Sequence, residues 1–304
     1  AAAKVAEGPL GELPQELFAG RNPDHPCLLA AAAALCAVWK PPGWAVSVTS
    51  EDDDDGEMLP PEDEGRAGGG RPLQEWLAEN VGDGHPIARD ASRGHGLVHR
   101  LDSGTSGPVL WARTYAGYYA ARLQFAARRV DKEYVSLCHG WMPQTPRMLE
   151  ASLAKTAPES GRGAPRSIVS PQGRPARTEV LRAAHLVDPQ GEPFSLVHVR
   201  LHTGRMHQIR AHLSHEGHPL AGDALYGGGS PVWCPPRFCL HCAGVSILMS
   251  DGPLTVSVAL PRDMREALAV LSPAGVREAA AARASAEGGF TGRREAAGQP
   301  AGGA

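Results

Sequence analysis

The feature that most constrains this chain is the stretch at residues 97–107 (LVHRLDSGTSG), where polar groups crowd between two apolar runs. Residues 108–111 (PVLW) form the second of these runs. Gly104 and Gly107 allow a left-handed backbone or a close backbone approach. The pattern predicts a strand–turn–strand unit that holds Asp102 in a fixed direction at the mouth of a cleft. On spacing alone, an ordinary turn with a solvated Asp102 is an equal alternative.

Residues 99–107 (HRLDSGTSG) resemble the His-Arg-Leu-Asp-x-x-Thr-Ser-Gly signature of the RluA-type (RluA/RsuA-like) RNA pseudouridine synthases. The motif is long and uninterrupted, which makes the resemblance specific. A weaker alternative is the His-Arg-Asp loop of protein kinases. Here Leu101 stands between the Arg and the Asp, no Asn follows at the kinase spacing, and no Gly-rich loop with a downstream Lys precedes the motif. The kinase alternative is therefore set aside.

Further segments carry the same resemblance in the family's order. Residues 40–43 (KPPG) resemble its Lys-Pro-x-Gly step, and residues 132–134 (KEY) resemble its Lys-x-Tyr strand. Residues 203–213 (TGRMHQIRAHL) resemble its Thr-Gly-Arg-x-His-Gln-Ile-Arg-x-His-Leu segment, with Met206 where Thr is common. Residues 240–242 (LHC) resemble its Leu-His-Ala step, with Cys in place of Ala.

The resemblance implies an enzyme that isomerises specific uridines to pseudouridine in structured RNA (tRNA, rRNA or mRNA), with the target base flipped into the cleft. It implies that Asp102 is the nucleophile and that Tyr134 is a second active-site residue. Because a buried carboxylate needs a partner, we expect the Arg205 guanidinium to pair with Asp102. The residues expected to contact substrate or RNA are His99, Arg100, Thr105, Lys132, Arg210 and Leu240. Attack at C6 of uracil, attack at C1′ and a glycal path are all open, and no cofactor is needed.

Within the substrate set, the expected roles differ. Arg100 would fill the space that the flipped base leaves, and Leu240 would pack the floor of the pocket. Lys132 and Arg210 would hold local structure or phosphate.

We expect an α+β fold: a long, bent, mixed but mostly antiparallel sheet flanked by helices, with the cleft across its middle. The strand order comes from the resemblance. Apolar periodicity predicts helices over residues 72–81 and 114–129, and strands over residues 130–140, 195–202 and 254–260, with another strand from residue 177 and a closing helix from about 261. Residues 28–38 are predicted as a short helix or the start of a strand.

The expected organisation has three parts. Residues 1–37 form an N-terminal extension or linker, residues 38–272 the catalytic domain, and residues 273–304 a low-complexity tail. Residues 49–70 are predicted as a disordered acidic insertion. Residues 155–175 contain one Lys and three Arg among Gly, Pro and Ser, and are predicted as a mobile basic loop.

The charge of the chain is unevenly distributed. Residues 51–64 hold nine acidic residues and no Lys or Arg, and without them the formal net charge rises from −3 to +6. A mildly basic body with one acidic loop suits a polyanionic partner such as RNA. The longest apolar run, at residues 28–38, is about half of what a membrane span needs, so we expect no membrane association. We also expect a monomer.

The six cysteines show no paired framework, which indicates a reducing compartment: the cytoplasm, a mitochondrion or a plastid. Cys234, Cys239, His241 and Cys242 are compatible with either a zinc site or ordinary packing. Because no matching second ligand pair follows, packing is favoured and no metal is predicted. A metal site among the histidines between residues 202 and 218 is disfavoured because Met and Arg interrupt the set and no carboxylate completes it.

Two other functions stay open. One is a catalytically silent RNA-binding protein of the same fold. The other is a carboxylate-based glycosidase, which normally needs two acids flanking the scissile bond, whereas only Asp102 is well framed here. Release of free uracil separates glycoside cleavage from isomerisation.

Overall fold

The computed structural model describes residues 11–18, 22–46, 72–156 and 165–275. The predicted acidic insertion at residues 49–70 lies outside these ranges, as does the predicted tail beyond residue 275. No helix within the described ranges combines the length and apolar character needed to cross a lipid bilayer.

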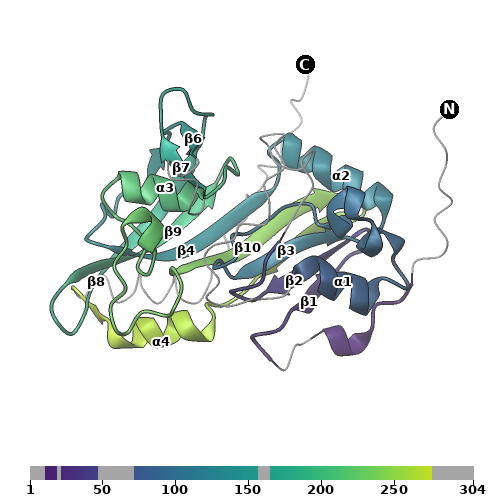
Figure 1. Cartoon of the computed structure of the whole chain (residues 1–304), viewed down its shortest axis with the longest axis horizontal. Helices are drawn as coiled ribbons and strands as arrows, with labels where there is room; N and C mark the ends of the chain where they lie inside the picture. Colours follow the sequence, from purple (N-terminus) through teal and green to yellow (C-terminus); the bar gives the residue numbers. More distant parts are fainter. Residues whose placement is uncertain (1–10, 19–21, 47–71, 157–164, 276–304) are drawn as a thin grey trace, which may run out of the picture.

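Two antiparallel sheets form the centre of the molecule (Figure 1). The first has the order β1-β2-β3, and the second has the order β11-β10-β4-β9-β8-β12, with β5 paired to β8. The strands of the first sheet are β1 (Cys27–Ala31), β2 (Leu35–Lys40) and β3 (Gly107–Ala112). Those of the second are β4 (Asp131–His139), β5 (Arg147–Leu149), β8 (Thr178–Val187), β9 (Pro193–Leu201), β10 (Leu240–Met249), β11 (Gly252–Ser257) and β12 (Ser272–Pro273). A separate hairpin consists of β6 (Leu153–Thr156) and β7 (Arg166–Val169).

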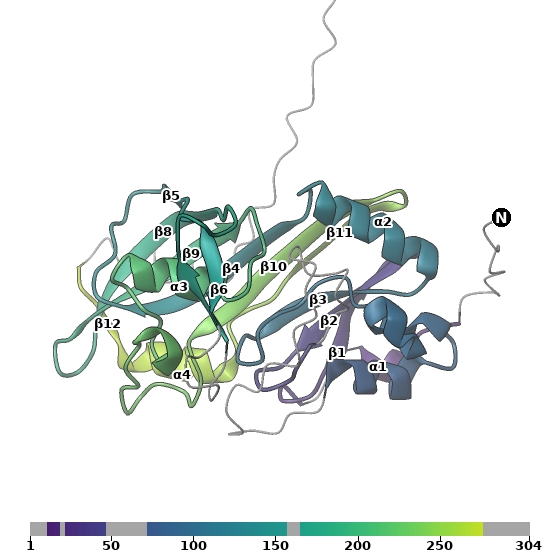
Figure 2. The same ribbon diagram turned by 45° about the horizontal axis from the view of Figure 1, so that its top comes forward.

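The two sheets meet where the central polar motif ends. Ser106 forms a parallel bridge with His241, and the Cys242 backbone N–H donates to the Ser106 carbonyl over 2.8 Å. β10 also packs against β3, so the sheets continue into one another across this junction (Figure 2). The expected α+β fold with a long, mostly antiparallel sheet is confirmed.

The middle strand β4 is buried on both faces. Tyr134 and Cys138 enter the largest core cluster on one face, and Val135 and Leu137 enter another on the opposite face. Alternate residues of a strand point to opposite sides, so this pattern places a layer of packed side chains on each side of β4. The cluster that contains Tyr134 also contains Leu101 and therefore reaches the central motif.

In the part of the chain that the structure describes, four α-helices and four short 3-10 helices accompany the sheets. The α-helices are α1 (Leu73–Val81), α2 (Tyr115–Ala126), α3 (Gln208–His215) and α4 (Arg262–Val270). The 3-10 helices are η1 (Gln15–Leu17), η2 (Pro86–Arg89), η3 (Ala91–Gly96) and η4 (Ala224–Tyr226). The predicted helices at residues 72–81, 114–129 and from about 261 correspond to α1, α2 and α4.

Local sequence explains where two of these helices lie. In α1, Leu73, Leu77 and Val81 are buried at successive i, i+4 positions, which makes one apolar face. The Thr114 side chain caps α2 by accepting a hydrogen bond from the Gly117 N–H over 2.9 Å. The predicted helices end close to these boundaries because the apolar spacing and the cap are both local signals.

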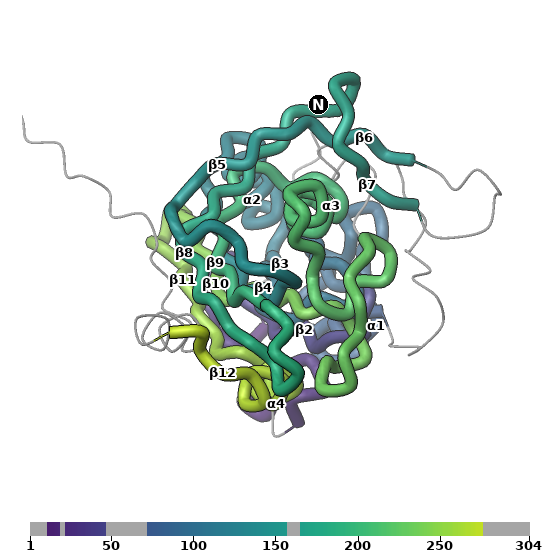
Figure 3. Tube along the Cα trace, turned by 90° about the vertical axis from the view of Figure 1, so that its left-hand side faces the viewer, coloured from purple at the N-terminus to yellow at the C-terminus, as the bar shows by residue number. Residues whose placement is uncertain are grey.

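The helix α3 is an element that the sequence analysis did not anticipate. Residues 208–213 are all buried, so the segment has no contrast between an apolar and a polar face. It packs against β7 of the separate hairpin (Figure 3) and against β8. The burial that this helix needs comes from strands far away in the chain.

Three other predictions need correction. The expected boundary between residues 37 and 38 falls inside β2, which pairs with both β1 and β3, so residues 27–37 belong to the first sheet. Of the two alternatives for residues 28–38, the helix is wrong and the strand is right, because these residues lie in β1, β2 and the turn between them. The expected loop at residues 155–175 includes β7 and the end of β6 in its described part, because the two strands hydrogen-bond to each other.

The glycine at the start of β3 allows the close approach of the two sheets. Gly107 has a φ of 134°, and a Cβ built on it would lie 2.4 Å from the carbonyl oxygen of Cys242. Both the backbone conformation and the contact therefore exclude a side chain at this position. The sheets can meet here only because residue 107 lacks a Cβ.

We expect Gly107→Ala to lower the free energy of unfolding by about 3 kcal/mol, because strain and overpacking add. Urea denaturation followed by circular dichroism measures this loss. Gly191→Ala is the matched control, because Gly191 also has a positive φ, of 85°, but no atom within 4 Å of its added Cβ. Equal losses in the two variants would contradict the packing argument.

Candidate active site

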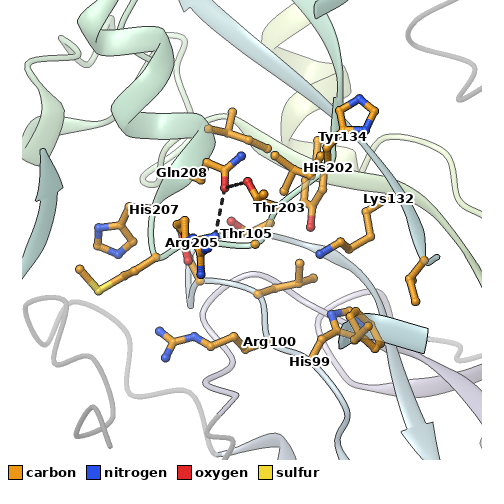
Figure 4. Close-up of a pocket in the computed structure, with 18 of the residues that line it drawn as sticks. His99, Arg100, Thr105, Lys132, Tyr134, His202, Thr203, Arg205, His207 and Gln208 are labelled. Atoms are coloured by element: carbon orange, nitrogen blue, oxygen red, sulfur yellow. Dashed lines mark hydrogen bonds between the residues drawn. The ribbon is translucent and has the colours of Figure 1, made fainter. Parts of the chain in front are cut away.

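A cleft of about 430 Å³ lies beside the junction of the two sheets. The central motif, β4 and the segment that leads into α3 contribute to its wall. All nine predicted site residues line it: His99, Arg100, Asp102, Thr105, Lys132, Tyr134, Arg205, Arg210 and Leu240. Residues separated by more than a hundred positions in sequence are therefore brought to one place. Figure 4 shows Lys132 and Tyr134 pointing into the cleft, with Arg100 and Arg205 across from them.

We call the loop at residues 99–107 the Asp102 loop. Hydrogen bonds from the KPPG segment at residues 40–43 hold its backbone in place. The Thr105 N–H donates to the Asp102 carbonyl over 3.0 Å and closes a turn. The Ser103 carbonyl accepts from the Gly43 N–H over 2.8 Å and from the Lys40 ammonium over 2.9 Å. Lys40 is fully buried, and its Nζ also donates to the carbonyls of Pro41 and Trp44. This step of the sequence therefore fixes the backbone next to Asp102.

The Arg210 guanidinium lies beside the Asp102 carboxylate. Its Nη1 lies 3.5 Å from Asp102 Oδ2, while its Nε and Nη2 donate to Asp223 over 2.8 and 2.9 Å. The Arg210 guanidinium also stacks on the Phe238 ring at 4.1 Å. The sequence analysis assigned Arg210 to local structure or phosphate, and the Asp223 pair is such a local contact. The proximity to Asp102 was not predicted.

The predicted partner of Asp102, Arg205, lines the same cleft and is fixed through its backbone. The Arg205 N–H and the Thr203 hydroxyl both donate to Gln208 Oε1, over 3.0 and 2.7 Å (Figure 4). The Arg205 Nε donates to the Pro175 carbonyl over 3.3 Å. His207 adopts a left-handed conformation with a φ of 50°, which turns the chain into α3. Its pairing with Asp102 stays a prediction.

Gln208 and Asp223 are site-supporting residues that the sequence analysis missed. Gln208 lies inside the segment that resembles the family, but a neutral amide in a charged motif gives no separate signal. Its Nε2 also donates to the Arg177 carbonyl and to the Thr178 hydroxyl. Asp223 lies in a Gly-containing loop, and only the fold shows that it binds Arg210.

Tyr134 and Lys132 reach the cleft from β4, two residues apart on the same face. Burial raises the pKa of Tyr134 well above its ordinary value, and the negative charge of Asp102 raises it further. The phenol is therefore a neutral hydroxyl that can donate a hydrogen bond. The Lys132 ammonium lies 5.4 Å from the centre of the Phe125 ring.

His99 holds the Asp102 loop to β3. Its Nε2 accepts the Leu110 N–H over 2.9 Å, and its ring lies 5.2 Å from the Phe125 ring. Burial lowers the pKa of His99 to about 3, and the positive charge of Lys132 contributes to the lowering. The sequence analysis expected His99 to contact RNA, but its Nε2 is engaged with the protein backbone.

Three predicted residues form the floor and the rim of the cleft. Leu240 is buried and pairs with Ser136 of β4. Thr105 is also buried, and its hydroxyl has no hydrogen-bond partner among the described residues. Arg100 is half-buried and extends along the rim (Figure 4). The floor is thus formed by an apolar side chain and a buried hydroxyl.

Two of the histidines that suggested a metal site, His207 and His212, are engaged with the protein. His212 contacts the Thr178 hydroxyl over 2.9 Å and the Ala151 carbonyl over 2.8 Å, and His207 contacts the Tyr226 hydroxyl over 3.2 Å. Within the described ranges, no three His, Cys, Asp or Glu side chains gather in an arrangement that could hold a metal ion.

Two of the buried histidines, His99 and His241, predict acid sensitivity. Burial, with the charge of Arg237, lowers the pKa of His241 to about 4. Because the unfolded chain has ordinary histidine pKa values near 6.5, it binds more protons than the folded chain below that pH. Stability is therefore complete above pH 6.5 and falls as the pH falls toward 4, by up to about 1.4 kcal/mol per pH unit for each histidine.

We expect His99→Gln to reduce this slope by about 1.4 kcal/mol per pH unit between pH 6 and 4.5, since the amide can accept the Leu110 N–H without titrating. Urea denaturation at several pH values measures the slope. An unchanged slope would show that His99 does not contribute to it.

The comparisons with known proteins all indicate the same family. A family model described as RNA pseudouridylate synthase matches residues 35–215, more than half of the chain. An uncharacterized RNA pseudouridine synthase of Chloroflexus aurantiacus is 42% identical over 153 residues, which cover 50% of this chain and 45% of that protein. The ribosomal large subunit pseudouridine synthase D of Yersinia pestis is 34% identical over 144 residues, 47% of this chain and 41% of that one. The chain thus spans about half the length of these relatives.

Among solved structures, human RNA Pseudouridylate Synthase Domain Containing 1 matches with a TM-score of 0.58 and 22% identity, over 87% of this chain and 97% of that one. This likeness concerns the fold.

Proposed function

Since this chain belongs to the RNA pseudouridylate synthase family, we propose that it isomerises uridine to pseudouridine in structured RNA. The observation that carries the proposal is the Asp102 carboxylate, which lines the cleft with the Arg210 guanidinium 3.5 Å away. A cation at this distance favours the ionised carboxylate, which is the reactive form of the side chain.

The reaction breaks the N1–C1′ bond, turns the uracil and forms a C5–C1′ bond. A proton leaves C5 and a proton is gained at N1, so the reaction has no net oxidation or reduction. In the proposal Asp102 supplies the nucleophile or the base. Attack at C6, attack at C1′ and a glycal path each place this carboxylate beside the base and the sugar.

Tyr134 and Arg205 have complementary roles in the proposal. The Tyr134 ring offers a surface on which uracil can stack, and its neutral hydroxyl can pass a proton. Arg205 lies in the same cleft and supplies positive charge toward the carboxylate or an RNA phosphate. Lys132 adds a second cation on the β4 side.

A base in folded RNA reaches this cleft only after it leaves its stack, at a cost of a few kcal/mol. In the proposal Arg100, at the rim, occupies the space that the base leaves. Arg100→Ala is expected to lower the rate on folded RNA, where flipping is costly, more than on an unstructured oligonucleotide. Equal rate losses on the two substrates would contradict this role.

Large-subunit ribosomal RNA is the substrate class that we propose first, because two relatives from Yersinia pestis are named ribosomal large subunit pseudouridine synthases C and D. Transfer RNA and messenger RNA are the competing classes. The partner is thus RNA, and the proposed organisation is a catalytic region that includes β1 and extends to about residue 272.

Tritium release from RNA labelled at C5 of uridine tests the proposal. Large-subunit rRNA, tRNA and total RNA are incubated separately with the purified chain, and free uracil is measured in parallel. We expect release of tritium without free uracil. Free uracil would indicate glycoside cleavage, and no release from any RNA by a folded protein would favour the catalytically silent RNA-binding alternative.

A further inference from the structure

Arg237 lies directly behind the Asp102 loop and outside the nine predicted site residues. Its Nη1 donates to the Gly104 carbonyl over 2.9 Å. The same nitrogen donates to the carbonyls of Phe238 and Leu240, over 3.2 and 3.1 Å. One guanidinium therefore connects the backbone of the Asp102 loop with the segment that enters β10.

The Arg237 guanidinium is itself held by α4. Its Nε donates to Asp263 Oδ2 over 2.7 Å, and its Nη2 donates to Asp263 Oδ1 over 3.1 Å. The Arg237 side chain is 9% exposed, and a buried cation without a carboxylate partner would be costly. Burial opposes ionisation of Asp263, but the hydrogen bonds and charge of Arg237 lower its pKa below the ordinary value overall. Arg237 and Asp263 therefore form a bidentate ion pair.

Phe238, the residue after Arg237, packs against the Arg210 guanidinium that lies beside Asp102. The Phe238 ring lies 4.1 Å from the Arg210 guanidinium, and a Cβ on Gly104 would lie 2.8 Å from the same ring. Segment 237–240 thus contacts the loop that carries Asp102, the guanidinium beside it and, through Leu240, the floor of the cleft. The carboxylate and its cation are fixed relative to each other by one short segment.

We propose that Arg237, supported by Asp263 of α4, is a positioning residue that fixes the direction of the Asp102 carboxylate through the Gly104 carbonyl. This inference rests on the proposed function, since it assigns a support to the same site. Arg237 does not line the cleft, so its effect on the reaction passes through the backbone. A displacement of about 1 Å at a reacting group can cost about a hundredfold in rate.

Steady-state tritium release from labelled large-subunit rRNA tests this role. We expect Arg237→Met to lower kcat by about 10- to 100-fold with KM changed less than threefold, because the RNA-binding surface is intact. Arg237→Lys should recover part of kcat, since an ammonium still donates to carbonyl oxygens. The double variant Arg237→Met with Asp263→Asn should be no slower than Arg237→Met alone, because the two residues act as one unit.

Hydrogen exchange gives a readout that needs no substrate. Peptides from residues 99–107 should exchange faster in Arg237→Met than in the unaltered protein, while peptides from β4 are unchanged. If Arg237→Met does not fold, Asp263→Asn can be used instead, because it retains the arginine. We expect it to show a smaller increase in the exchange rate of the same peptides. Arg262→Gln is the matched control, because Arg262 is an exposed residue of α4 that pairs with Glu266.

The outcomes are distinct. A raised KM with unchanged kcat would assign Arg237 to RNA binding and overturn the proposal, as would an unchanged kcat in a folded variant. If the unaltered protein released no tritium from any RNA, the proposed function would fail. Hydrogen exchange at residues 99–107 would then decide on its own whether Arg237 holds the loop.

Discussion

Asp102→Asn is expected to lower tritium release from uridine-labelled RNA by about 10⁴-fold or more, since the amide keeps the shape of the side chain but can neither attack carbon nor take a proton. The loss should appear in kcat, with binding of the RNA retained. Single-turnover release with excess enzyme measures the chemical step directly.

The Asn variant should fold normally, because the Asp102 side chain is 16% exposed and leaves no deeply buried charge unpaired. Asp83→Asn is the matched control, because Asp83 is an exposed carboxylate that pairs with Arg89 away from the cleft. Retention of more than a tenth of the rate by Asp102→Asn would exclude Asp102 as the nucleophile.

Arg210→Met is expected to lower the free energy of unfolding by about 3–5 kcal/mol, because it leaves the Asp223 carboxylate buried without its cation. The Asp223 side chain is 1% exposed and receives two hydrogen bonds from Arg210. Urea denaturation measures the loss. A loss below about 1 kcal/mol would show that the pair contributes little to the fold.

A second variant separates the two contacts of Arg210. Adding Asp223→Asn to Arg210→Met removes the unpaired charge and should recover a large part of the stability. Activity should stay low in the double variant, because Asp102 still lacks the guanidinium beside it. Recovery of activity along with stability would show that Arg210 acts on the reaction only through the fold.

The resemblance to the family, carried by short continuous motifs, is what indicated the nine site residues. Residues 99–107 and 132–134 each form one continuous piece of loop or strand, so their geometry follows from nearby residues. All nine predicted residues line the cleft, but Arg205, Arg210 and Leu240 are brought there by the fold. Their separate roles in the reaction stay predictions.

The proximity of Arg210 to Asp102 could not be predicted in the same way. Asp102 and Arg210 are 108 positions apart, and the chain offers Arg205 and Arg210 within one segment with nothing to rank them. The left-handed turn at His207 and the helix α3 determine where each guanidinium lies. Neither feature has a periodic or compositional signal in a segment that is buried on all sides.

The junction of the two sheets has a consequence for how the protein is made. The Ser106 hydroxyl contacts His241 Nδ1 over 3.0 Å across 135 positions, and Gly104 depends on Arg237 over a similar separation. During synthesis the N-terminal sheet, with Asp102 at its edge, leaves the ribosome long before β10 and α4 do. The nascent chain therefore carries its carboxylate in an incompletely held loop until its later strands have emerged. The acquisition of activity should report the docking of those strands, a late and non-local event in folding.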